Sequence, residues 1–155
     1  MQAKFLALSL PLAFALAAAG VPASAKADKE HHGGVKLSAA LSGANEVDAQ
    51  GAANKGDPDG TGSFSGRIVP GQGQLCYTLT WSGVDTPTMA HIHSGAVGVN
   101  GPVFIGLAEL APGEHCIAVD QEKATALVAK PQDFYANIHN PAFPGGALRG
   151  QLVKN

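Results

Sequence analysis

Charged residues, aromatic residues and cysteines are all scarce in this sequence of 155 residues. Charged side chains make up 14% of it, and 10 basic against 12 acidic residues give a formal net charge of −2. A chain without a basic excess lacks the electrostatic footprint of sequence-independent nucleic-acid binding, so we expect no nucleic-acid partner. Two cysteines are too few for a disulfide scaffold. The chain also has no low-complexity run of Lys and Glu, which argues against wholesale disorder.

Long apolar runs are missing except at the N-terminus. There, Lys4 is the only charge, residues 5–19 are mostly apolar, and 23–25 read Ala-Ser-Ala, a small-x-small cleavage signal. The run is shorter than the roughly 20 residues that a bilayer-spanning helix needs. We therefore expect residues 1–25 to be a signal peptide rather than an anchor. The mature chain would begin at Lys26, be periplasmic or secreted, and have no membrane span.

Glycine and proline, by contrast, are abundant, with 20 and 10 residues, and they predict many turns and short elements. Period-two alternation of apolar residues marks eight candidate strands. They lie at 35–43, 62–69, 74–83, 89–95, 102–107, 113–119, 134–139 and 147–153. One short helix is expected over 121–130, capped by Asp120 and ended by Pro131. This pattern predicts one all-β domain over 35–155, a sandwich or Greek-key barrel, preceded by a flexible tail at 26–34.

The two cysteines, Cys76 and Cys116, both fall in predicted strands. An even pair in an exported chain favours a disulfide. Such a bond would close a loop of about 40 residues and stabilise the fold by roughly 4 kcal/mol in the chain-entropy model. The alternative is a pair of reduced, buried thiols.

Two segments carry a family resemblance. Residues 90–107 read AHIHSGAVGVNGPVFIGL, and residues 134–152 read FYANIHNPAFPGGALRGQL. Together with LSGANEV at 41–47, they resemble the CHRD (chordin-type) domain in its bacterial exported form. The resemblance implies an immunoglobulin-like antiparallel β-sandwich, a Greek key similar to the topology of copper/zinc superoxide dismutase. It implies no defined activity, and the sequence departs from the family pattern after Val47.

Polar residues of the two segments sort onto one face by strand parity. His91 and His93 are two apart, so they point the same way on their strand. The same argument places other polar residues on the face away from the core, provided that the strands are neighbours. The resulting motif polar patch would contain His91, His93, Tyr135, Asn137, His139 and Arg149.

Two interpretations of this patch are open. His-x-His plus a third histidine from another strand is a common transition-metal arrangement, so His91, His93 and His139 are candidate ligands for copper or zinc. Alternatively, the patch is a hydrogen-bonded network that fixes the loops, and Arg149 would disfavour a cation nearby. His115 is a poor fourth ligand because it faces away from its neighbour Cys116. His31 and His32 belong to the predicted tail.

Other patterns are weaker. The loop at 95–102 lacks the Lys-Ser/Thr end of a phosphate loop, and 57–61 lacks most ligands of a calcium loop, so both predict turns. No nucleophile–base set is recognisable. Two functions remain. One is an exported, non-catalytic module of the cell envelope or extracellular space, bound to an unidentified protein, an envelope or matrix component, or a second copy of itself. The other is a copper- or zinc-binding protein that uses a surface histidine cluster.

Overall fold

The computed structural model describes residues 33–155. The predicted signal peptide at 1–25, and the predicted tail up to residue 32 with His31 and His32, lie outside the described residues. Within them, no helix is long and apolar enough to cross a membrane.

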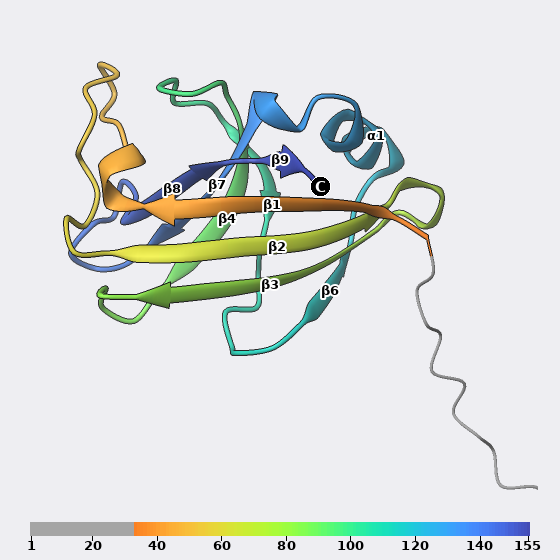
Figure 1. Cartoon of the computed structure of the whole chain (residues 1–155), viewed down its shortest axis with the longest axis horizontal. Coiled ribbons are helices and arrows are strands. Elements are labelled where there is room, and N and C mark those ends of the chain that lie inside the picture. Colours follow the sequence, from red (N-terminus) through yellow and green to blue (C-terminus); the bar gives the residue numbers. More distant parts are fainter. Residues whose placement is uncertain (1–32) are drawn as a thin grey trace, which may run out of the picture. The chain divides into compact units, whose positions relative to one another are not determined.

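The described chain forms one antiparallel sheet of nine strands with a single α-helix (Figure 1). The strands are β1 (Val35–Ser42), β2 (Thr61–Val69), β3 (Gln74–Ser82), β4 (Met89–Ser94), β5 (Val103–Gly106), β6 (His115–Ala118), β7 (Phe134–His139), β8 (Leu148–Gln151) and β9 (Val153–Lys154). They are ordered β5-β4-β7-β8-β1-β2-β3-β6, and β9 pairs with β1. The predicted all-β class with one short helix is confirmed.

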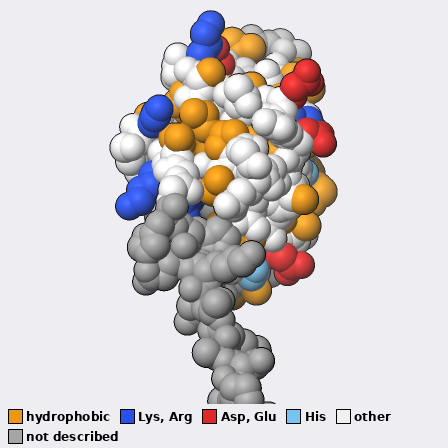
Figure 2. All heavy atoms as spheres, turned by 90° about the vertical axis from the view of Figure 1, so that its right-hand side faces the viewer, with side chains coloured by type: hydrophobic (Ala, Val, Ile, Leu, Met, Phe, Trp, Pro, Cys, Tyr) orange, Lys and Arg blue, Asp and Glu red, His pale blue; other side chains and the backbone are white. Residues whose placement is uncertain are grey.

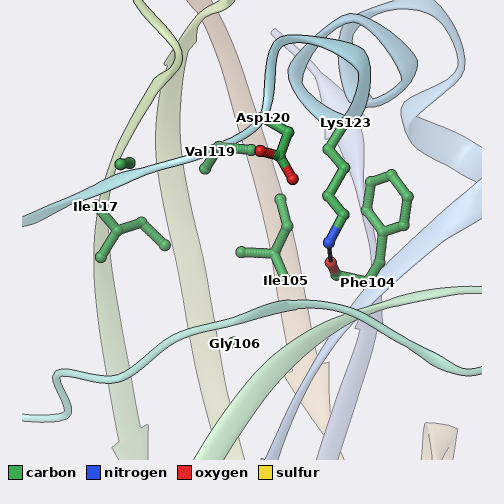
Figure 3. A pocket seen from close by; sticks show the side chains of 8 residues that line it. Phe104, Ile105, Gly106, Ile117, Val119, Asp120 and Lys123 are labelled. Atoms are coloured by element: carbon green, nitrogen blue, oxygen red, sulfur yellow. Dashed lines mark hydrogen bonds between the residues drawn. The ribbon is translucent and has the colours of Figure 1, made fainter.

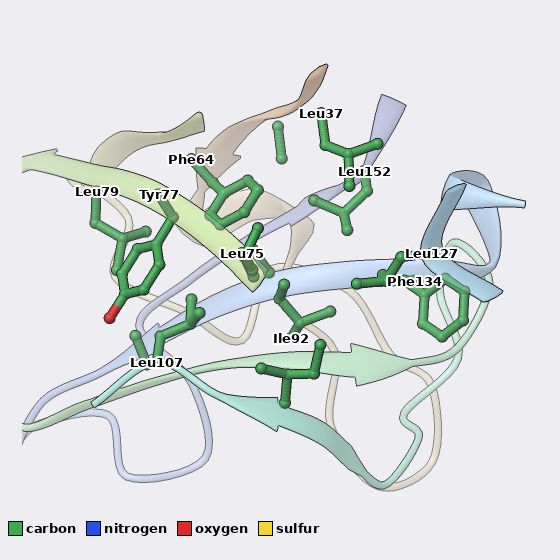
Figure 4. Close-up of a cluster of buried hydrophobic side chains, with 14 of the residues drawn as sticks. Leu37, Phe64, Leu75, Tyr77, Leu79, Ile92, Leu107, Leu127, Phe134 and Leu152 are labelled. Carbon is green, nitrogen blue, oxygen red and sulfur yellow. The ribbon is translucent and has the colours of Figure 1, made fainter. Parts of the chain in front are cut away.

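The sheet curls on itself at the junction of β8 and β1, which pair only at Arg149 and Ser42. The two groups of strands on either side of this junction enclose one hydrophobic core (Figures 1 and 4). Leu37, Phe64 and Leu75 enter the core from one group, and Ile92 and Leu152 come from the other. Apolar side chains at alternate positions of each strand meet there, as the period of two requires.

The hairpin of β2 and β3 follows directly from its turn. Pro70 to Gln72 form a 3-10 turn that ends at Gly73, whose φ of +57° lies in the left-handed region that favours glycine. The two strands then pair over their full length, from Thr61 with Ser82 to Val69 with Gln74.

The helix α1 (Gln121–Ala129) covers one end of the core with Ala124 and Leu127. Asp120 occupies its N-cap position without a side-chain capping bond, and Pro131 begins the following 3-10 turn. Helix bounds therefore agree with the sequence prediction, although the capping interaction expected of Asp120 is absent.

Two features of the sheet refine the prediction. Cys76 and Cys116 stand opposite each other on β3 and β6 and form a disulfide, as predicted. The predicted strand at 147–153 is divided at Leu152, whose buried side chain enters the core while its N–H donates to the Phe134 carbonyl. β9 then pairs with β1 instead of continuing β8.

Candidate functional site

Strands β4, β7 and β8 are neighbours, so the polar residues of the two motifs form one continuous strip. His93 pairs with Tyr135 across β4 and β7, and His91 pairs with Asn137. Asn137 in turn stands opposite Arg149 on β8. The adjacency that the parity argument required is therefore present.

Arg149 anchors one half of the strip. Its side chain is only 2% exposed, and its guanidinium donates to Asn100 Oδ1 at 3.0 Å and to the carbonyls of Ala96 at 3.1 Å and Val99 at 2.7 Å. The guanidinium carbon lies 3.4 Å from the centre of the Tyr135 ring, a cation–π contact. These bonds tie the loop at 95–101 down over the sheet.

Glu46 supplies the counter-charge to Arg149. Its Oε1 lies 3.8 Å from the guanidinium, and both side chains are buried. Burial raises the pKa of Glu46, opposed by the Val47 N–H, the charge of Arg149 and a hydrogen bond from Asn137. Gly146 closes over the carboxylate so tightly that a Cβ there would stand 2.3 Å from Oε2.

His93 lies in the other half of the strip, with its ring stacked on Tyr135 at 4.9 Å. Its Nδ1 is 2.9 Å from the Gly101 carbonyl. A carbonyl only accepts, so Nδ1 carries the hydrogen and the lone pair of the neutral ring resides on Nε2. That Nε2 is buried and has no hydrogen-bond partner.

His139 is held in the same tautomer. Its Nδ1 donates to the Pro144 carbonyl at 3.0 Å, which leaves the lone pair on Nε2. This Nε2 lies 3.2 Å from His91 Nδ1 and 3.1 Å from Asn137 Oδ1. Because this lone pair can only accept, the hydrogen bond between the two rings has His91 Nδ1–H as its donor.

The three histidines together form a compact nitrogen cluster. One ring nitrogen from each of His91, His93 and His139 lies within 4.8 Å of the others. Burial is the main cause that lowers the pKa of His91, and the charges of His139 and His93 lower it further. Burial also lowers the pKa of His139, and His93 adds to this, although the bond to Pro144 opposes it. Lowered pKa values favour neutral imidazoles, the form that ligates metals.

The predicted surface cluster lies only partly at the surface, because His91 and His93 are partly exposed while the rest of the strip is buried. Tyr135, Asn137, His139 and Arg149 are all buried, and His139 is only 7% exposed. The strip faces away from the core, but the connections at 43–60 and 95–102 fold over it. Asn100 links these two connections, because its amide donates to the carbonyls of Val47 and Asp48 while its oxygen accepts from the arginine.

Several partners of the strip were absent from the sequence prediction. Glu46 and Asn100 were not assigned a role, and the carbonyls of Gly101 and Pro144 carry no signal in the sequence. The motif PGG at 144–146 could have suggested a close backbone approach, which Gly146 makes against the buried carboxylate.

The remaining candidates form no comparable site. Cys76, Glu114 and Cys116 lie together, but the disulfide removes both thiols as ligands. His115 bonds to the Ala111 carbonyl. The 95–102 loop turns its carbonyls toward the arginine and His93, which is the opposite of the N–H cradle that an anion needs.

A separate cavity of about 380 Å³ lies between β5, β6 and the start of α1 (Figure 3). Phe104, Ile117 and Val119 give it apolar walls, and Asp120 and Lys123 stand at one side. Lys123 Nζ donates to the Phe104 carbonyl at 2.8 Å, so it caps the outer edge of β5. No cluster of ligating side chains lines this cavity.

Fold and site thus define a β-sandwich-like module with a histidine cluster beneath its loops. The family model described as CHRD domain matches residues 37–152. The chain therefore belongs to the CHRD domain family. No curated protein and no solved structure matches it.

Proposed function

We propose that this CHRD-domain module binds one copper or zinc ion through His91, His93 and His139. The observation that carries the proposal is the buried Nε2 of His93, which has a lone pair and no partner. A buried polar atom without a partner costs about 1–3 kcal/mol. A metal ion held by the three neighbouring imidazoles removes that cost.

The two halves of the strip distinguish metal binding from a purely structural network. Arg149 itself is saturated, since it has partners for both terminal nitrogens and a ring beneath its plane, although Oε2 of the neighbouring Glu46 has no hydrogen-bond partner. The histidine half instead brings ring nitrogens together around a buried lone pair. We assign the arginine half to structure and the histidine half to ligation.

Backbone carbonyls support the ligands as outer-shell groups support known metal sites. A metal-bound histidine usually donates its other ring N–H to a carbonyl or carboxylate, which fixes the tautomer. The carbonyls of Gly101 and Pro144 do this for His93 and His139. Both ligands would thus enter the site with their Nε2 atoms ready to bind.

Arg149 does not oppose a cation in this arrangement. Its charge is matched by Glu46, and the Tyr135 ring lies between the guanidinium and His93. The usual order of divalent affinities places Cu(II) above Zn(II) for such a nitrogen site. We therefore expect copper to be the preferred ion.

Calorimetric titration with Cu(II) and Zn(II) tests the proposal. The chain should carry His31→Ala and His32→Ala so that these histidines add no second site. One ion per chain should bind, and His93→Asn should abolish binding. His115→Asn is the matched control, because this histidine lies outside the cluster and should leave the titration unchanged. A flat titration of the parent chain would reject the metal site.

The proposal includes export and a non-catalytic role. The charge, apolar core and small-residue pattern of residues 1–25 support export, and the disulfide accords with an oxidising compartment, periplasmic or extracellular. Protein recovered from outside the cytoplasm should have a mass that lacks Met1–Ala25. Retention of this segment would identify an anchor instead.

Binding of a protein partner or a second copy is the other candidate function. It is supported by exposed apolar side chains, Val97 and Val99 on the loop at 95–101 and Val103 on the edge strand β5. Figure 2 shows another face of the molecule, where apolar side chains gather between basic side chains on one margin and acidic side chains on the other. This face as a whole is therefore not uniformly basic. Light scattering tests the second-copy form, since a mass that stays at one chain over all concentrations would reject it.

A further inference from the structure

We infer that the Met89 thioether is a ligand for reduced copper, so that the site holds Cu(I) as well as Cu(II). The inference rests on the proposed histidine site and adds to it a fourth, soft ligand. Only two methionines occur in the chain, and the other is Met1. The proposal therefore concerns a single sulfur atom.

The strand register places Met89 beside the cluster. Met89, His91 and His93 alternate along β4, so their side chains share one face of the sheet. Across the sheet, Met89 stands directly opposite His139 on β7. Cβ atoms of opposed residues lie about 5 Å apart, and methionine has three rotatable bonds beyond its backbone. The sulfur can therefore reach the nitrogens of both neighbouring histidines.

The exposure of Met89 shows that its side chain is not part of the hydrophobic core. Its side chain is 49% exposed, whereas Ala90 and Ile92, on the opposite face of β4, are buried in the core. An exposed methionine contributes little to folding, so this side chain is free to take another role beside the histidines. Ligation is such a role.

A cavity of about 220 Å³ connects Met89 and His91 to solvent. Gly106 on β5 pairs with His91 and also lines this cavity. A Cβ added at Gly106 would meet nothing within 4 Å, so the absence of a side chain there keeps the opening beside His91 wide. An ion thus has a route to the cluster that passes the thioether.

Ligand chemistry then selects the ion. Thioether sulfur is a soft ligand that favours Cu(I), whereas imidazole suits both Cu(II) and Zn(II). Loss of the sulfur should therefore weaken Cu(I) binding and leave Cu(II) and Zn(II) binding nearly unchanged. This selective effect separates a sulfur ligand from a general disturbance of the site.

Met89→Leu provides the test because leucine keeps the apolar character and approximate volume of the side chain. Cu(I) affinity is measured without oxygen by competition with a chromophoric Cu(I) chelator, with ascorbate as reductant. Cu(II) affinity is measured by calorimetry. Both use the chain with His31→Ala and His32→Ala. We expect Cu(I) affinity to fall about tenfold or more, and Cu(II) affinity to change less than about twofold.

Two controls accompany the variant. Val153→Leu changes another exposed apolar residue, on β9, and should alter neither affinity. A thiol assay after the ascorbate step must find no free cysteine, since a reduced Cys76–Cys116 pair would itself bind Cu(I). Met-methyl NMR adds a direct readout, because in the mature chain the single methionine resonance should shift when diamagnetic Cu(I) is added.

The outcomes separate the two proposals. If the parent chain binds Cu(II) but its Cu(I) affinity is the same as that of Met89→Leu, the thioether is not a ligand, and the histidine site stands. If the parent chain binds neither ion, the histidine site itself is rejected, and the sulfur ligand falls with it. A selective loss of Cu(I) affinity together with a shifted methyl resonance supports both.

Discussion

Replacing Arg149 by lysine is expected to destabilise the chain strongly, although the charge is kept. The guanidinium donates three hydrogen bonds in a planar fork and stacks on Tyr135. A lysine ammonium is a point charge that cannot reproduce this fork. We expect it to keep one of the three bonds and to lose the stacking.

The magnitude follows from the bonds that are lost. A hydrogen bond to a charged group contributes about 1.5–3 kcal/mol, and two such bonds disappear. Water can reach the carbonyls of Ala96 and Val99, because both residues are exposed, and this offsets part of the loss. The net decrease in the free energy of unfolding should be about 2–4 kcal/mol. Urea unfolding followed by circular dichroism measures it.

Arg67→Lys is the matched control. Arg67 lies on β2, is partly exposed and forms an ion pair with Glu114 at 3.7 Å. Exposed ion pairs contribute about 0–1 kcal/mol, so this variant should stay within about 1 kcal/mol of the parent. If Arg149→Lys were no more destabilising than the control, the assignment of the arginine half to structure would be refuted.

Three further predictions concern other parts of the fold. Gly146→Ala should cost several times more stability than Gly145→Ala in urea melts, because only at 146 is φ positive (+142°) and a Cβ driven against the carboxylate of Glu46; equal effects would contradict the close approach. Unfolded, unreduced mature protein should titrate with no free thiol, and replacing Cys76 and Cys116 together by alanine should cost about 4 kcal/mol; two free thiols would disprove the bond. The metal-free chain carrying Glu46→Gln, which removes the opposing titration of that carboxyl, should lose stability as pH falls from about 6.5 through the lowered pKa values of His91 and His139. In the folded chain these two histidines bind a proton only at a lower pH than in the unfolded chain, so acid favours unfolding. A free energy of unfolding that stayed constant down to pH 5 would contradict the pKa shifts.

Strand parity accounts for what the sequence could predict of the site. Side chains alternate strictly along a strand, so His91 and His93 had to share a face, and the order of residues in the second motif fixed its polar face in the same way. The disulfide was predictable because export and an even cysteine count point to one pairing.

Loop structure accounts for what the sequence could not predict. Connections have no period, so nothing in the residues at 43–60 showed that they fold over the strip and bury it. Glu46 lies in such a connection, and its role depends on a glycine a hundred residues later that leaves room for its carboxylate. Two supports of the histidines are backbone carbonyls, which every residue possesses and no motif reveals.

Electron paramagnetic resonance of the Cu(II) complex tests the central claim most directly. The sample is the mature chain with His31→Ala and His32→Ala, loaded with one equivalent of Cu(II). The account predicts a single copper species whose spectrum shows coupling to imidazole nitrogens from His91, His93 and His139, and each single His→Asn variant should remove one nitrogen or the whole signal. A spectrum that is the same in all three variants, or one of copper free in solution, would contradict the assignment of this cluster as a metal site.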